Sequence, residues 1–232
     1  MGLADFDVAL VRADNPGPLT LSGTNTWVLG RDPAWVVDPG PALPAHLDAV
    51  AAEVDARGGA GGIAVTHTHP DHVEGLAALR ERLGGVPVAD VGDERLGPLR
   101  VLPLPGHADD HAVFVAGRVA FTGDAVLGTG SVFVESRLGE YLAGLERLRA
   151  LDLALLCPGH GDPVEDPAGR IGELIAHRMD REAALVAALE RGLRSEDELL
   201  DAAWGDAPVA LRPAAARSLA AHLEKLREEG RL

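Results

Sequence analysis

The stretch Ile-Ala-Val-Thr-His-Thr-His-Pro-Asp-His at residues 63–72 decides the fold. Its apolar first three residues favour a buried strand, along which side chains alternate between two faces. His67 and His69 are therefore expected on the same side, whereas Asp71 and His72 fall in the turn that opens a helix. One loop thus offers two imidazoles to one metal ion, and a carboxylate with an imidazole to a neighbouring ion. Ligands of this kind without a thiolate suit Zn²⁺, with Mn²⁺ or Fe²⁺ as alternatives, and the competing interpretation is a solvated His-rich loop.

Three further predicted strands end in a glycine turn that is followed by a ligand-type residue. The turns are Pro-Gly-His at 105–107, Thr-Gly-Asp at 122–124 and Pro-Gly-His at 158–160. Taken alone, each of His107, Asp124 and His160 would more often be an ordinary loop residue. The same placement after three strands, together with the first motif, instead predicts one metal site at the strand ends.

The order of these residues resembles the ligand set of the metallo-β-lactamase superfamily of binuclear hydrolases, and the resemblance covers nearly the whole chain. It implies an α+β fold, an αββα sandwich with two Zn²⁺ per chain at one sheet edge, Mn²⁺ or Fe²⁺ being the alternatives. For the first ion it implies the ligands His67, His69 and His107. For the second ion it implies Asp71, His72 and His160, and it implies Asp124 as the ligand that bridges the two ions. Val-Asp-Pro-Gly at 37–40 resembles the family's early Asp motif. Asp38 is therefore expected to orient a ligand imidazole, rather than to be a plain turn residue.

Three segments narrow the resemblance within the superfamily. Leu-Thr-Leu-Ser-Gly-Thr-Asn-Thr-Trp (19–27) and Pro-Gly-His-Ala-Asp-Asp-His (105–111) resemble a subgroup that includes a lactamase-like mitochondrial endoribonuclease and thioesterases acting on carrier-bound polyketides. His-Arg-Met-Asp-Arg-Glu (177–182) opens a tail that resembles the winged-helix appendage of that subgroup. Two features depart from the pattern. Residues 128–137 lack the histidine that serves the transfer-RNA-processing branch as proton donor, and almost no sequence follows the third tail helix to form a wing.

Hydrophobic periodicity divides the chain into a strand-rich part and a helical tail. Strands are expected at 6–11, 25–29, 35–37, 63–65, 86–88, 101–104, 112–115, 119–122 and 155–157, helices at 44–57, 74–83 and 139–150, and a glycine loop at 58–62. Tail helices are expected at 170–191, after a capping box opened by Ser195, and from Pro213 to Gly230. The last of these carries Leu219, Leu223 and Leu226 on one face, which needs a partner surface. We predict a metallo-β-lactamase-fold catalytic domain at 1–168 and a three-helix, winged-helix-like domain at 169–232.

Composition restricts the location and the partners of the protein. Of its 232 residues 47% are hydrophobic and 25% charged, and it has one cysteine, Cys157. Neither a membrane-spanning apolar run nor a secretory signal is visible, and a single cysteine fits a reducing compartment, so a cytoplasmic protein without a membrane partner is expected. The Arg-, Ala- and Gly-rich usage favours a bacterial source. The net charge is −15, and residues 170–232 hold 10 basic and 12 acidic side chains, which disfavours nucleic acid as a partner. A small-molecule or carrier-bound substrate is expected, and the leucine face suits the catalytic domain or a second copy in a homodimer.

The predicted function is zinc-dependent hydrolysis, in which two metal ions turn a shared water into a hydroxide that attacks an acyl carbon or a phosphorus. Asp71 would orient this nucleophile, and His111 is the candidate proton donor or supporting residue. A small thioester or lactone is the favoured substrate, and an RNA phosphodiester is the alternative. A nucleic-acid binder with a structural metal site is disfavoured, because structural zinc sites are usually closed, single-metal and Cys-rich. The remaining histidines are expected at the surface or in packing roles, far from the motifs: His46, His177 and His222.

Overall fold

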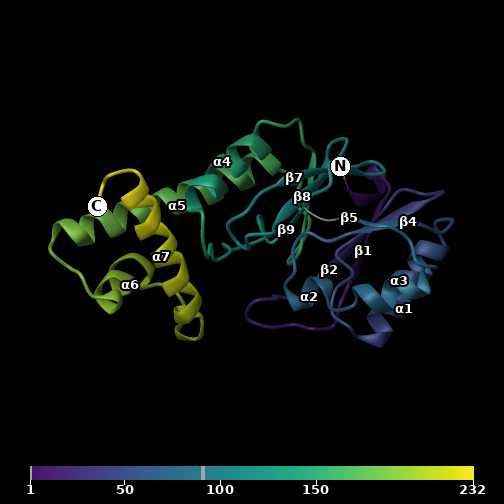
Figure 1. Cartoon of the computed structure of the whole chain (residues 1–232), viewed down its shortest axis with the longest axis horizontal. Coiled ribbons are helices and arrows are strands. Elements are labelled where there is room, and N and C mark those ends of the chain that lie inside the picture. The colour runs from purple at the N-terminus through teal and green to yellow at the C-terminus, as the bar shows by residue number, and fades with distance from the viewer. Residues whose placement is uncertain (1, 90–91) are drawn as a thin grey trace.

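Two five-stranded sheets face each other between layers of helices in the computed structural model, which describes residues 2–89 and 92–232 (Figure 1). The first sheet has the order β1 (Val8–Arg12), β2 (Asn25–Leu29), β3 (Ala34–Val37), β4 (Ala60–Ala64) and β5 (Val88–Ala89). The second has the order β10 (Leu155–Pro158), β9 (Val119–Gly123), β8 (Ala112–Ala116), β7 (Leu99–Pro103) and β6 (Arg95–Leu96). The predicted αββα sandwich is confirmed, and β6 is a two-residue strand that the periodicity did not indicate.

The core of the sandwich lies between the sheets and under the helices on their outer faces. Trp27, Phe114 and Phe121 are at most 1% exposed and belong to the cluster between the sheets, where each large apolar side chain contributes about 1.5–3 kcal/mol. The outer clusters involve α1 (Pro44–Asp55) and α3 (Leu76–Arg82) on the first sheet, and α4 (Leu138–Arg149) and the first half of α5 (Pro167–Glu190) on the second. A 3-10 turn, η1 (Leu3–Phe6), precedes β1.

One local prediction was wrong, and the close packing of a glycine explains it. The expected loop at 58–62 is partly strand, because β4 begins at Ala60. A Cβ on Gly61 would lie 2.7 Å from Trp35 Cζ2, so the strand runs beneath the indole without side chains that would reveal it. The helix expected at 74–83 is confirmed as α3. A short helix, α2 (Pro70–Val73), precedes it, and the break between the two falls at Gly75, where a Cβ would lie 2.7 Å from Leu47 Cδ2.

The tail consists of helices, as predicted. α5 ends at Glu190, and α6 (Glu196–Trp204) begins after a short connection with the expected Ser195 capping box. A 3-10 turn, η2 (Val209–Leu211), then leads to α7 (Arg212–Glu228). The leucine face of α7 packs within the chain, since Leu219 and Leu226 are buried in a cluster with α5 and α6. No strand is described after residue 166, so the described tail has no β-wing.

Helix α5 contributes to two separate cores. Its first half places Ile171 and Leu174 in the cluster of the second sheet, and its second half places Leu185 and Ala188 in the tail cluster. Figure 1 shows α6 and α7 beyond the end of the sandwich, joined to it through α5. Among the described residues, no helix is both long and apolar enough to cross a membrane.

Candidate metal centre

The predicted ligands lie where strands of both sheets end. His67 follows β4, His107 follows β7, Asp124 directly follows β9 and His160 follows β10. The adjoining turns need glycine for space. A Cβ on Gly159 would lie 2.6 Å from Asp124 Oδ1, and one on Gly123 (φ 46°) would lie 2.5 Å from the hydroxyl of Thr66. Glycine at these positions therefore lets the loop at Gly159 approach Asp124, and the end of β9 at Gly123 approach Thr66.

Segment 19–27 forms hydrogen bonds that hold the loop carrying His160. Asn25 Nδ2 donates to the carbonyls of Pro158 (2.9 Å) and Gly161 (2.8 Å), and Trp27 Nε1 donates to the same Pro158 carbonyl (3.0 Å). Both side chains are buried. The segment thus holds the end of β10 against β2, which fixes the position of His160 relative to the first sheet.

Three histidines converge in a first group. His69 Nδ1 lies 3.0 Å from His67 Nε2 and 3.0 Å from His107 Nε2. Nitrogens bound at about 2.0–2.1 Å to one tetrahedral zinc would be roughly 3.4 Å apart, so this group has nearly the required spacing. Their ligating atoms fall within 4.8 Å of one another, as the resemblance implied for one ion.

A second group contains Asp71, His72 and His160, with Asp124 between the two groups. His160 Nε2 lies 3.2 Å from Asp71 Oδ2 and 3.5 Å from Asp124 Oδ2. Asp124 Oδ2 is also 3.6 Å from His107 Nε2, and Asp124 Oδ1 is 3.5 Å from His72 Nε2. One carboxylate therefore faces both groups. The structure brings all seven predicted ligands together, and their binding of metal stays a prediction.

The outer nitrogens of these imidazoles are held by other groups of the protein. Asp38 Oδ2 lies 2.8 Å from His72 Nδ1, and the two oxygens of Asp38 also accept from the backbone and the hydroxyl of Thr66. His107 Nδ1 lies 3.1 Å from the Phe133 carbonyl oxygen, and His160 Nδ1 lies 3.3 Å from that of Gly23. Such contacts fix the orientation of a ligand imidazole, and the structure places Asp38 where this role requires it.

The residues present fit metal ions. Both His72 Nε2 and Asp124 Oδ1 are buried without a hydrogen-bond partner, which is costly unless another group binds them. They belong to a cluster with His67 whose ligating atoms lie within 4.8 Å of one another. Imidazole and carboxylate donors of this number suit two ions of the Zn²⁺, Mn²⁺ or Fe²⁺ class better than one.

Electrostatics separate the imidazoles into two kinds. Burial, together with the charges of His72 and His111, lowers the pKa of His67, and burial also lowers that of His107. Burial would lower the pKa of His160 as well, but its contacts with Asp124 and Asp71 raise it to about 10. The carboxylates of Asp124 and Asp71 thus favour the protonated form of His160, and a metal ion bound there would have to displace that proton.

His111 lies behind the predicted ligands. Its side chain is buried, and Nε2 accepts from the backbone N–H of Asp124 at 3.1 Å, so this nitrogen carries no proton. Nδ1 is buried without a partner, and burial with the charge of His107 lowers the pKa to about 3. The proton-donor prediction therefore finds no support in this placement. The geometry fits the other predicted role, support of Asp124.

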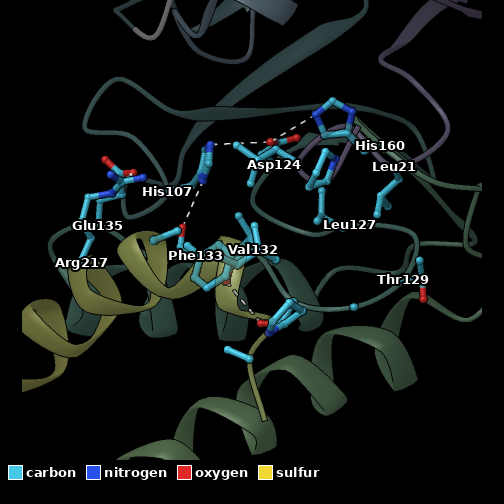
Figure 2. Close-up of a pocket in the computed structure, with 18 of the residues that line it drawn as sticks. Leu21, His107, Asp124, Leu127, Thr129, Val132, Phe133, Glu135, His160 and Arg217 are labelled. Carbon is cyan, nitrogen blue, oxygen red and sulfur yellow. Dashed lines mark hydrogen bonds and ion pairs between the residues drawn. The ribbon is translucent and has the colours of Figure 1, made fainter. Parts of the chain in front are cut away.

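A cavity of about 700 Å³ lies between the ligand groups and the tail. The ligand-group residues that line it are His69, Asp71, His107, Asp124 and His160, and the tail residues include His177, Arg178, Arg181, Trp204 and Arg217. Figure 2 shows His107, Asp124 and His160 along one side, with Val132 and Phe133 between them and the tail helices. The expectation that His177 lies far from the motifs was wrong, because α5 runs along this cavity. His46 and His222 are buried, as a packing role requires, but His46 is not far from the motifs, because its Nε2 lies 2.9 Å from the hydroxyl of Thr26 in segment 19–27.

Tail residues hold the segment that forms the wall beside His107. Arg170 donates to the carbonyls of Leu127 and Gly130, and Arg178 donates to Ser131 Oγ and to the Val132 carbonyl. On α7, the Ser218 hydroxyl bonds both the N–H and the carbonyl of Val134, each at 3.0 Å. Because Phe133 in this segment accepts from His107, the tail helps to position a predicted ligand.

Comparison with known families matches both parts of the chain. The family model "Metallo-beta-lactamase superfamily" matches residues 86–160, and "Beta-lactamase associated winged helix domain" matches residues 195–232. The beta-lactamase-like protein 2 homolog of Drosophila melanogaster is 32% identical over 94% of this chain and 87% of its own length. An atrochrysone carboxyl ACP thioesterase of Cryptosporiopsis is 28% identical over 88% of this chain and 69% of its own length.

Solved structures give the same assignment. A metallo-beta-lactamase family protein from Thermus thermophilus superposes with a TM-score of 0.71 at 28% identity, covering 97% of this chain and 94% of that one. A second structure, solved in a di-iron-bound form, has a TM-score of 0.57 at 26% identity and covers 72% of this chain and 98% of that one. The chain therefore belongs to the metallo-β-lactamase superfamily of hydrolases and carries its C-terminal winged-helix-type domain.

Proposed function

We propose that the protein is a binuclear zinc hydrolase that acts on a small acyl substrate, a thioester or a lactone. The observation that carries this proposal is the cavity of about 700 Å³, which joins the ligand groups to the tail. Pockets of about 300–1,000 Å³ are typical of small-molecule sites. The similarity to a carrier-protein thioesterase supports acyl chemistry in particular.

In this mechanism the seven clustered side chains would hold two metal ions, and these would supply a nucleophile from water at neutral pH and polarise the substrate carbonyl. Asp71 is the ligand-group residue best placed to orient that nucleophile, because its side chain is 28% exposed and lines the cavity. Its contacts with Thr24 (3.4 Å) and His160 (3.2 Å) both use Oδ2. Oδ1 is therefore assigned to accept a hydrogen bond from the attacking water and so to orient it.

A substrate panel tests the proposal. Metal-loaded protein would be assayed against acyl thioesters, lactones, bis-p-nitrophenyl phosphate and single-stranded RNA. Turnover of thioesters or lactones well above that of both phosphodiesters is expected. Faster cleavage of RNA than of every acyl compound would overturn the proposed substrate class and favour the endoribonuclease alternative.

We expect two metal ions per chain at saturation, because seven ligands exceed what a single tetrahedral ion uses. Asp124 faces both groups, so its carboxylate could contact an ion held by either group. Elemental analysis of protein loaded with Zn²⁺, and separately with Fe²⁺ or Mn²⁺, measures the number and the preferred metal. Saturation at one ion would contradict a bridging role for Asp124.

We expect single-stranded RNA to bind full-length protein with a Kd weaker than about 10⁻⁴ M at 200 mM salt, the weak end of the non-specific range. Four of the five cations in residues 195–232 are in ion pairs with carboxylates of this chain: Arg212, Arg217, Lys225 and Arg231. Such pairing leaves little charge for phosphates. Titrations at about 50 and 200 mM salt measure this. Micromolar affinity with a steep salt dependence, lost when the tail cations are neutralised, would favour the nucleic-acid alternative.

A further inference from the structure

Arg178 is a buried cation in the wall of the cavity without a carboxylate partner. The residue is 2% exposed, lines the cavity, and belongs to the 177–182 motif on α5. Its Nη2 donates to the Ser131 hydroxyl (2.9 Å) and to the Val132 carbonyl, and its Nε has no hydrogen-bond partner. Among the described residues, no ion pair joins Arg178 to an acidic side chain.

The other arginines of the cavity are neutralised, which makes Arg178 exceptional. Arg181 forms a two-bond pair with Asp206 at 2.6 and 2.8 Å, and Arg217 pairs with Glu135 at 2.7 Å. The chain has 36 acidic residues for 21 basic ones, so an unpaired cation is not explained by a shortage of carboxylates. Burying a charge without a counter-charge is costly, and carbonyl contacts compensate only part of that cost.

The surroundings of Arg178 suit an anion. Burial and the charge of Arg181 lower the pKa of Arg178 against a hydrogen bond to Tyr141, but a guanidinium keeps its proton at neutral pH. Ser131, whose hydroxyl accepts from Arg178, lines the cavity as well, as do Thr129 and His177. Phosphate and carboxylate groups are the ligands that a guanidinium fork binds best.

We propose that Arg178 is an anion-binding residue of the cavity and that the substrate carries an oxyanion, a phosphate or a carboxylate, apart from the bond that is cleaved. The assignment rests on the proposed function only for the acyl part of the substrate. The metal-binding groups and Arg178 line the same cavity, so one ligand can reach both.

The first test measures binding without catalysis. Full-length, metal-loaded protein would be titrated calorimetrically with inorganic phosphate and, separately, with succinate, to distinguish the two oxyanions. Arg178→Met should weaken binding of at least one anion about 10- to 100-fold, the effect expected of a lost charge-assisted contact. Unchanged affinity for both anions in this variant would overturn the proposal.

Arg170→Met is the matched control. Arg170 lies on the same helix and also donates to carbonyls of the 127–134 segment, but it does not line the cavity. Loss of anion binding in both variants would show that Arg178 acts only by holding this segment, and it would overturn the proposal. If Arg178→Met does not melt cooperatively, Arg178→Lys replaces it. Lysine keeps the charge but not the fork, so a loss of several-fold is expected.

The second test compares three acyl thioesters in each variant: neutral S-acetyl-N-acetylcysteamine, its succinyl counterpart, and acetyl coenzyme A. For Arg178→Met, kcat/KM for an anionic thioester should fall about 10- to 100-fold more than for the neutral one, mainly through KM. Arg170→Met should change all three alike. Equal losses in Arg178→Met would contradict the proposal. If no thioester is hydrolysed by the wild type, the proposed function fails, and the calorimetric result still decides the role of Arg178.

Discussion

Replacing Asp71 or His107 with alanine is expected to lower kcat by about 10³-fold or more, while the protein still folds. A catalytic metal ion contributes several kcal/mol of transition-state stabilisation, and each 1.36 kcal/mol is tenfold in rate. Asp71 faces the cavity from the second group, and His107 belongs to the first, so each variant disables a different half of the site. Steady-state rates and metal content of both variants measure the effect.

The fold should tolerate these changes because the sandwich core lies elsewhere. The cluster between the sheets is built from apolar side chains of the strands and contains no predicted ligand. Asp109→Ala is a suitable control, since Asp109 lies two residues from His107 but bonds only the exposed Ser136 hydroxyl among its described contacts. It should retain activity within a few-fold. Loss of cooperative melting in both ligand variants would instead show that the site is structural.

The candidate ligands were predictable from sequence because local motifs mark them, whereas their division into two groups came from the resemblance to the superfamily. Alternation along an extended segment places His67 and His69 together, and the same strand–glycine–ligand order recurs at His107, Asp124 and His160. Asp38 was predicted from the early Asp motif, and the structure places it 2.8 Å from His72. The strand missed in the sandwich, β6, has two residues, which is too short for a periodic pattern.

The cavity was not predictable in the same way. The side of the cavity opposite the predicted ligands comes from α5, α6 and α7. No local sequence pattern predicts which face of α5 contacts the loop at 128–137. His177 and Arg178 were visible as part of a motif, yet helical periodicity alone suits them equally to a solvated face. Only the packing of the tail on the sandwich places them beside the predicted ligands. Likewise, the burial of His111 behind Asp124 depends on the contact between two loops 13 residues apart.

We expect the largest loss of stability when the buried ion pair of Glu182, the last residue of the 177–182 motif, is broken. Glu182 is 2% exposed and accepts from Lys225 at 2.7 Å and from Arg231. Lys225→Met is expected to lower the free energy of unfolding by about 3 kcal/mol, because removing one partner leaves a buried charge. The loss should lie at the low end of the usual range, since Arg231 remains. For a chain of this size, that corresponds to a fall in Tm of about 6–12 °C.

A paired variant separates the buried charge from simple loss of contacts. Glu182→Leu combined with Lys225→Met removes both charges, so most of the stability should return, as when a buried ion pair is replaced by apolar groups. Arg212→Met is the exposed control. Its pairs with Asp197 and Asp201 are solvent-accessible, so it should cost at most about 1 kcal/mol.

The pH dependence of the same pair follows from the carboxylate. Contacts with Lys225 and Arg231 hold the pKa of Glu182 below its usual range against the effect of burial. The contribution of the pair to the free energy of unfolding is therefore present above the unfolded pKa of about 4.5 and is lost as the pH falls through the lower folded value.

Thermal melts at pH 7 compare the Tm of Lys225→Met with that of Arg212→Met. A Tm for Lys225→Met no lower than that of Arg212→Met would show that the Glu182 carboxylate does not depend on its partner.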